Sequence, residues 1–200
     1  MIDIPVPLVL ASSSPVRRQL LGQLVRRFEV VCPEADEAAV ADDDPRRLAT
    51  RLAELKARDV AARRLYALVI AADTLVVCDG EVIGKPRDRR DAVRIMKKLT
   101  SSSHEVLTGL CVMAPDGRRR TLCVATRLRM RPISAGEIEA YVDGPGALDR
   151  AGVYALQPDD PNVLELRGSP TCVMGLPVDE LAGVLRELYQ DELDKQAEER

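Results

Sequence analysis

Residues 67–78 read ALVIAADTLVVC and form the most apolar run of the chain. This length, with the turn-forming pair Asp79 and Gly80 directly after it, is typical of a buried strand that ends in a hairpin. Asp73 interrupts the run, and a buried carboxylate is costly unless it has a charged partner or binds a metal. We therefore expect a central strand with a functional acid inside it. The alternatives are a strand that reaches the surface at Asp73 and an aspartate bound to a neighbouring backbone group.

Strand patterns and helix patterns alternate on both sides of this run. Apolar runs and turn signals predict further strands at 6–11, 28–32, 105–113, 121–130 and 163–166. Helical spacing and start signals predict helices from 15, over 45–64, over 88–99, from 134 and over 178–189. The order predicts an α/β fold with an elongated mixed sheet and flanking helices. We expect one domain over residues 1–190, followed by a charged and frayed tail at 191–200.

Composition excludes several classes of protein. The net charge of −3 gives no sign of a nucleic-acid partner, and the single histidine, His104, excludes a two-histidine zinc site. The five cysteines form no Cys-x-x-Cys pair, which is typical of a reducing compartment. No apolar stretch has the length of a membrane span. We expect a cytoplasmic protein without a membrane partner, and we expect His104 to have a packing role.

The stretch LASSSPVRR, residues 10–18, combines a strand end, a serine-rich turn and a helix start. Free N–H groups and the helix dipole favour an anion at such a turn. Arg17 adds positive charge where it opposes the dipole unless an anion neutralises it. We predict phosphate binding by Ser12, Ser14 and Arg17. A plain Ser-Pro helix cap with solvated arginines is equally consistent with the local pattern.

Two lysines could serve the same site as Asp73. Lys56 borders the apolar stripe of the helix over 45–64, so it could reach a cleft beside the core. Lys85 lies in the segment GKP after the hairpin turn. A three-residue hairpin loop would place Lys85 opposite Asp73, and a two-residue loop would place it opposite Thr74. Solvated lysines are the alternative for both positions.

Other polar residues could complete a nucleotide site. Carboxylates of the acidic stretch at Glu34, Asp36 and Glu37 could share Mg²⁺ with Asp73 and with phosphate oxygens. Gln157 carries a donor and an acceptor on one amide, which suits recognition of a base edge. The P-loop and Rossmann phosphate motifs are both absent from the sequence.

Seven segments occur in one order over nearly the whole chain: LASSSPVRRQLL at 10–21, KA at 56–57, AADTLVV at 71–77, GKP at 84–86, HEVLTGL at 104–110, AGVYALQ at 151–157 and MGLPVDEL at 174–181. Together they resemble the Maf-like nucleoside triphosphate pyrophosphatase family. The resemblance implies a fold similar to the inosine triphosphate pyrophosphatases, with two lobes around a cleft and often a homodimer. It also implies hydrolysis of a nucleoside triphosphate to the monophosphate and pyrophosphate, with a divalent cation, Mg²⁺ or Mn²⁺.

The same resemblance implies roles for individual residues. Asp73 would accept the proton of the attacking water, and Glu37 would lie near the metal with it. Residues holding the triphosphate would be Ser12, Arg17, Lys56 and Lys85. Positions linked with base choice in the family fall on Val16, Thr74 and Gln157.

Base preference stays open between branches of the family. Thr74 and Gln157 resemble the dTTP/UTP branch, whereas Val16 fits neither branch. Many members of the family have arginine at this position, and a branch resembling the 7-methyl-GTP enzymes has tryptophan. The expected function is a house-cleaning pyrophosphatase for non-canonical or modified nucleotides with a dTTP/UTP-like preference. The alternatives are a 7-methyl-GTP pyrophosphatase and a non-catalytic, nucleotide-binding regulator of cell division.

Overall fold

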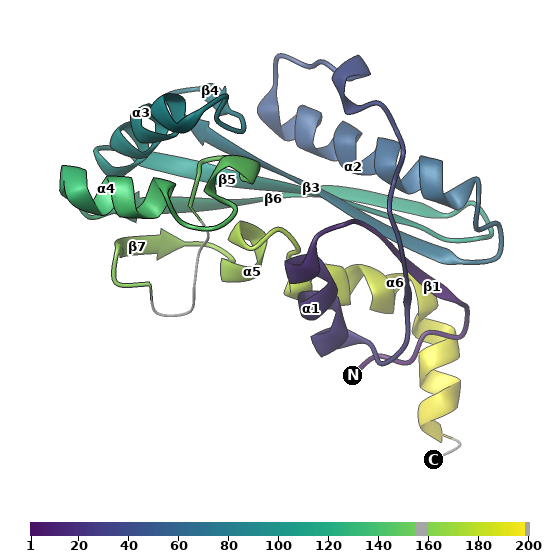
Figure 1. Cartoon of the computed structure of the whole chain (residues 1–200). Helices are drawn as coiled ribbons and strands as arrows, with labels where there is room; N and C mark the ends of the chain where they lie inside the picture. Colours follow the sequence, from purple (N-terminus) through teal and green to yellow (C-terminus); the bar gives the residue numbers. More distant parts are fainter. Residues whose placement is uncertain (155–159, 199–200) are drawn as a thin grey trace.

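The computed structural model of the chain describes residues 1–154 and 160–198. Within this part, seven strands form one mixed sheet in the order β2-β1-β3-β5-β6-β7, and β4 pairs with β3 outside that path. The strands are β1 (Leu8–Ala11), β2 (Glu29–Val31), β3 (Leu68–Cys78), β4 (Glu81–Ile83), β5 (Ser103–Met113), β6 (Arg119–Met130) and β7 (Val163–Arg167). The sheet is elongated because β3, β5 and β6 are long and run side by side (Figure 1). The predicted mixed α/β sheet is confirmed.

Helices cover both faces of this sheet. They are α1 (Pro15–Leu24), α2 (Pro45–Ala61), α3 (Arg89–Thr100), α4 (Ala135–Val142), α5 (Pro170–Val173) and α6 (Val178–Glu198), with short 3₁₀ turns at Glu37–Ala39 and Ala147–Asp149. Local signals explain where the helices start. Ser14 caps α1 ahead of Pro15, and Ser134 forms the predicted capping box with Glu137.

Alternation along β3 assigns its residues to different helices. Val69 and Ala71 pack against α2 on one face, whereas Ile70 and Ala72 pack with α1 and α6 on the other. Farther along the sheet, Val76 belongs to a separate core with α3 and α4. The core is therefore divided between two ends of the elongated sheet, with α2, α1 and α6 at one end and α3 and α4 at the other (Figure 1).

The hairpin after β3 has a two-residue loop. Cys78 pairs with Glu81, and both loop residues have positive φ, 53° at Asp79 and 79° at Gly80. These angles suit a twisted two-residue hairpin. The three-residue alternative, which would place Lys85 opposite Asp73, is wrong. The β3–β4 ladder ends where Val76 pairs with Ile83.

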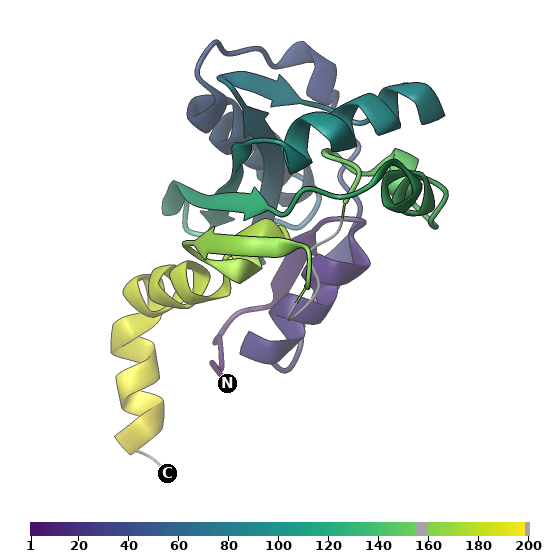
Figure 2. The same cartoon turned by 90° about the vertical axis from the view of Figure 1, so that its left-hand side faces the viewer.

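Two features at the C-terminal end differ from the sequence prediction. The four-residue helix α5 was not predicted, because so short a segment shows no helical periodicity. Helix α6 was expected to end at Tyr189, but it kinks there, with φ −129° and ψ 24°, and continues to Glu198. The part of the tail at 191–198 is therefore helical rather than frayed, and it projects away from the sheet (Figure 2). No helix among the described residues combines the length and apolarity needed to cross a bilayer.

Candidate functional site

The site is built along one edge of β3. Strand β1 pairs with β3 only as far as Ala11 opposite Ala71, and β4 begins its pairing at Val76 opposite Ile83. Between these two ladders, residues 72–75 have no strand partner on this edge in the described part of the chain. A ligand at this edge could therefore approach groups from both faces of the sheet.

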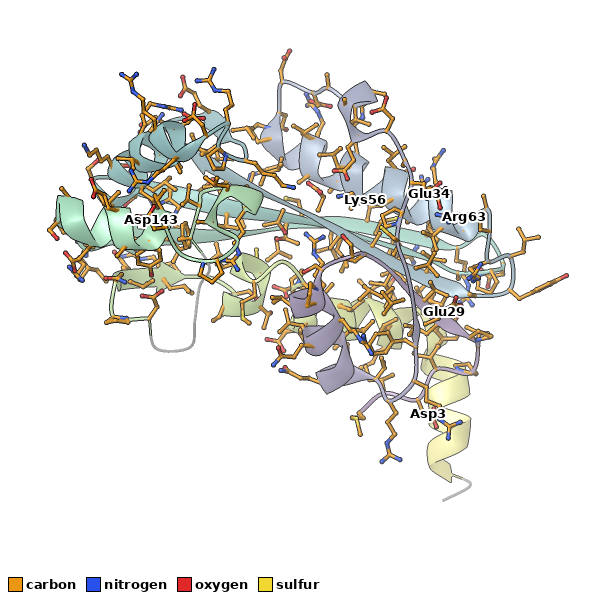
Figure 3. The ribbon with its side chains drawn as sticks, viewed as in Figure 1. Asp3, Glu29, Glu34, Lys56, Arg63 and Asp143 are labelled. Carbon is orange, nitrogen blue, oxygen red and sulfur yellow. The ribbon has the colours of Figure 1, made fainter. Side chains whose placement is uncertain are left out.

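Asp73 and Lys56 form a buried ion pair on the α2 face. Their exposed fractions are 8% and 7%, and Lys56 Nζ donates to Asp73 Oδ1 over 2.5 Å. Glu37 lies in the 3₁₀ turn after β2, and its Oε2 is 3.0 Å from the same ammonium group. Lys56 lies on α2, above the sheet in the view of Figure 3. The pair satisfies the buried aspartate, and one lysine joins both acids that the sequence analysis assigned to the metal.

A glycine brings α2 close enough for this contact. Gly109 on β5 lies directly opposite Asp73. A Cβ at Gly109 would be only 2.2 Å from the carbonyl oxygen of Ala49 on α2. The α2 backbone therefore packs directly on Gly109, and Lys56 lies on the same buried side of α2 as Ala49.

Arg17 approaches β3 from the opposite face. Its Nε donates to the carbonyl oxygen of Gly175 at 2.8 Å, and its Nη2 donates to Thr74 Oγ1 at 3.0 Å. Burial lowers the pKa of the Arg17 guanidinium, while the nearby carboxylates of Asp73 and Glu37 act in the opposite direction. The guanidinium is thus fixed beside the same edge of β3 that holds the acid.

The serine-rich turn is ordered by its own hydroxyl groups. The Ser14 N–H donates to Ser12 Oγ at 3.1 Å, and the Arg17 N–H donates to Ser14 Oγ at 3.3 Å. Ser12 is 4% exposed and directly follows β1. These contacts confirm the predicted helix cap and place the start of α1 at the end of β1, where a helix N-terminus can bind an anion.

The carboxylates at the site are of the type that a magnesium ion accepts as ligands. No group of three or more His, Cys, Asp or Glu side chains in the described residues could enclose a metal. Two carboxylates, Asp73 and Glu37, instead converge on Lys56. Mg²⁺ is commonly held by one or two carboxylates together with substrate phosphates and water, so this donor set is suitable for it.

Other predicted site residues are not part of this cluster. Lys85 is exposed and makes no hydrogen bond or ion pair with the described residues, and Val16 is 41% exposed. Of the acidic stretch, Glu34 pairs with Arg63 and Asp36 caps the 3₁₀ turn, so neither is directed to Asp73. Gln157 lies outside the described residues.

Sequence reasoning missed three residues that support the site. Thr108 and Gly109 occur in the quoted segment HEVLTGL, and Gly175 occurs in MGLPVDEL, but no role was assigned to them. Their signal was the presence of a hydroxyl and two glycines in distinctive segments. Their roles depend on contacts across the fold.

A cavity of about 1060 Å³ lies elsewhere in the protein. It is lined by the N-terminal segment, by Phe28 after α1, and by Leu65 and Tyr66 before β3. These residues are at the start of β1 and β3, whereas the site lies at the end of β1. The cavity is therefore distinct from the Asp73 cluster.

The chain has clear relatives among known proteins. Residues 7–188 match the family described as Maf-like protein. The dTTP/UTP pyrophosphatase of Anaeromyxobacter dehalogenans (strain 2CP-C) is 44% identical over 183 residues, covering 90% of this chain and 92% of the relative. The dTTP/UTP pyrophosphatase of Geobacter sulfurreducens is 41% identical over 184 residues, covering 90% of this chain and 96% of the relative.

Similarity to solved structures is more distant. A nucleoside-triphosphatase / dITP/XTP pyrophosphatase from Mycobacterium abscessus is 14% identical, with a TM-score of 0.42 over 64% of this chain and 75% of that one. The Staphylococcus aureus Ham1 protein is also 14% identical, with a TM-score of 0.46 over 62% of this chain and 71% of that one. The family match and the sequence relatives cover nearly the whole length of the chain, and on that ground this chain belongs to the Maf-like protein family.

Proposed function

We propose that the chain is a nucleoside triphosphate pyrophosphatase that hydrolyses dTTP and UTP to the monophosphate and pyrophosphate. The observation that carries this proposal is the buried Asp73–Lys56 pair at the open edge of β3, with Arg17 fixed beside it. An acid next to two cations suits hydrolysis of a polyphosphate. The relatives named dTTP/UTP pyrophosphatase support the reaction and the choice of bases.

Asp73 accepts the proton of the attacking water in this proposal. Lys56 binds Oδ1, and none of the described residues donates to Oδ2, so that oxygen is available to water. The Lys56 ammonium also fixes the orientation of the carboxylate through its bond to Oδ1. The water attacks the α-phosphorus, the bond to the β-phosphate oxygen breaks, and pyrophosphate leaves.

The cations hold the triphosphate chain. Arg17 can present a planar set of N–H donors to phosphate oxygens, and the N-terminus of α1 adds backbone donors beside Ser12 and Ser14. Lys85 follows β4, on the other side of the open β3 edge, and its exposed ammonium is free to reach a phosphate. These donors would bind the oxygens of the triphosphate and neutralise the negative charge that they already carry.

Asp73 and Glu37 are the residues that would hold a divalent cation, Mg²⁺ or Mn²⁺. When bound, the ion would neutralise charge on the phosphate oxygens and polarise the α-phosphate. Lys56 keeps the two carboxylates close together without it, since both contact one ammonium group. We also propose a homodimer acting on nucleotides in the cytoplasm, without a nucleic-acid or membrane partner.

The decisive experiment identifies the products. The protein is incubated with Mg²⁺ and dTTP, UTP or 7-methyl-GTP, and the phosphate product is separated beside an Asp73→Asn control. Pyrophosphate with the monophosphate, lost in the variant, is expected for dTTP and UTP. Faster hydrolysis of 7-methyl-GTP would reject the base preference. Nucleotide binding without turnover in either form would reject the enzyme in favour of a nucleotide-binding regulator.

A further inference from the structure

We propose that Thr108 is a positioning residue that orients Thr74 and, through it, the phosphate-binding guanidinium of Arg17. This inference rests on the proposed function, because it concerns how that site holds a triphosphate. It starts from a chain of hydrogen bonds between three side chains and one carbonyl. Arg17 Nη2 lies 3.0 Å from Thr74 Oγ1, Thr74 Oγ1 lies 3.0 Å from Thr108 Oγ1, and Thr108 Oγ1 lies 2.7 Å from the carbonyl oxygen of Cys172.

The direction of each bond follows from the number of protons available. A carbonyl oxygen can only accept, so the single hydroxyl proton of Thr108 is donated to Cys172. The bond between the two threonines must then use the hydroxyl proton of Thr74. Arg17 donates to Thr74, so every donor in the chain points the same way, from Arg17 to Cys172. Neither hydroxyl can rotate without breaking a bond.

This direction limits what Thr74 can do. Its only hydroxyl proton is donated to Thr108. The Thr74 oxygen can therefore only accept hydrogen bonds on the side that faces Arg17. While the chain is intact, Thr74 cannot donate a hydrogen bond to a carbonyl oxygen of a pyrimidine base. We infer that Thr74 acts on the substrate through Arg17 rather than by reading the base as a donor.

Thr108 itself is out of reach of a ligand. Its exposed fraction is 0%, and it lies on β5 directly opposite Thr74, on the second strand from the open edge. It therefore acts through other residues and is not catalytic. Its bond to Cys172 also connects this row of hydrogen bonds to α5. Gly175, whose carbonyl group is the second anchor of Arg17, follows α5 in the sequence.

The two anchors fix the plane of the guanidinium. Nε donates to Gly175 and Nη2 donates one proton to Thr74. Three of the five N–H protons of the guanidinium then stay available for a ligand. Gly175 has φ +100°, and a Cβ there would be 3.2 Å from Arg17 Nε and 3.3 Å from Thr74 Oγ1. The space around the anchors is therefore tight, and a planar group held in this way presents its free edge in one direction.

The test replaces Thr108 by Val, which keeps its shape and removes the hydroxyl, and by Ser, which keeps the hydroxyl. Thr100→Val is the matched control, since Thr100 is also buried and donates to a backbone carbonyl, that of Met96, but lies in α3. Calorimetry with Mg²⁺ measures binding of pyrophosphate and of a dTTP analogue with a non-hydrolysable α–β bridge. Steady-state kinetics measure KM and kcat for dTTP.

We expect Thr108→Val to lower the affinity for both ligands by the same factor, about fivefold, which corresponds to the loss of one ordinary hydrogen bond. KM should rise by that factor with kcat within about twofold, because Arg17 holds substrate and transition state alike. Thr108→Ser should restore both affinities, and Thr100→Val should lower only the melting temperature.

Two results would overturn the inference. The first is a Thr108→Val protein that is less stable but binds both ligands as the wild type does, which would leave Thr108 a purely structural role. The second is weaker binding of the dTTP analogue with unchanged binding of pyrophosphate, which would mean that Thr74 and Thr108 serve the base. If the wild type releases no pyrophosphate, the proposed function fails, and the calorimetric comparison still decides the role of Thr108.

Discussion

Replacing Gly109 by alanine should separate α2 from the sheet and disturb the Asp73–Lys56 pair. The added Cβ would lie 2.2 Å from the carbonyl oxygen of Ala49, 2.3 Å from its carbonyl carbon and 2.6 Å from the N atom of Thr50. All three are backbone atoms of a helix, so no side-chain rotation relieves the clash. An ordinary van der Waals contact of a Cβ is at least 3.4 Å long, so α2 must move outward by about 1 Å.

The expected size of the effect follows from that displacement. Overpacking of a core costs about 1–3 kcal/mol, and a clash with backbone belongs at the upper end. At about 3 kcal/mol, the melting temperature of a 200-residue chain should fall by roughly 6–12 °C. A displacement of about 1 Å in a catalytic group can cost on the order of 100-fold in rate. Lys56 would move with α2, so kcat should fall by a similar factor.

Thermal unfolding and pyrophosphate release measure these two effects separately. Gly183→Ala is the control, because Gly183 lies in helix α6 and a Cβ there meets nothing within 4 Å. That variant should keep its activity and be slightly more stable. The reasoning fails if Gly109→Ala melts within about 1 °C of the wild type, or if it is destabilised as expected and yet keeps its full kcat.

Three further outcomes test the site and the core. Asp73→Asn should lower kcat by about 10²–10⁴-fold while calorimetry still detects nucleotide binding; a variant with near wild-type kcat would exclude Asp73 as the base. Lys56→Met should lower the free energy of unfolding by about 3–5 kcal/mol, because Asp73 is left buried without its cation, and an unchanged urea midpoint would contradict the ion pair. Burial lowers the pKa of His104 to about 4 from 6.5, so His104 is neutral in the folded protein and takes up a proton on unfolding. The stability that this provides is present above pH 6.5 and is lost as the pH falls towards 4, by about 3 kcal/mol in total; urea titrations should show this loss, and His104→Gln should flatten it.

The elements of the fold could be predicted because their signals are local. The apolar run at 67–78 became β3, and the caps at Ser14 and Ser134 start the helices that they predicted. The approach of Lys56 to the core could be proposed from its place beside the apolar stripe of its helix. Its contact with Asp73 could not, because that depends on how closely α2 packs on Gly109.

Two further features depend on information that no local pattern contains. The register of the hairpin depends on whether its loop has two residues or three, and both loops are common for an Asp-Gly sequence. Arg17 is anchored on Gly175, which lies 158 positions away, beyond a segment whose four-residue helix shows no periodicity. A sequence pattern can propose that Arg17 binds phosphate, but only the folded chain shows what fixes its orientation.

The arrangement of the site follows from the two-residue repeat of a strand. Asp73 and Thr74 are adjacent, so their side chains point to opposite faces of the sheet. The antiparallel partner strand repeats this division, with Gly109 opposite Asp73 and Thr108 opposite Thr74. One face therefore carries the acid and, at Gly109, the space in which α2 packs. The other face carries two hydroxyls, of which that of Thr74 binds Arg17 and that of Thr108 binds Thr74. These opposed groups can serve one ligand because, among the residues that the structure describes, β3 has no strand partner at 72–75 on its other edge. A shift of the β3–β5 register by one residue would bury a hydroxyl under α2 and move the acid to the arginine face, so the proposed site depends on this register.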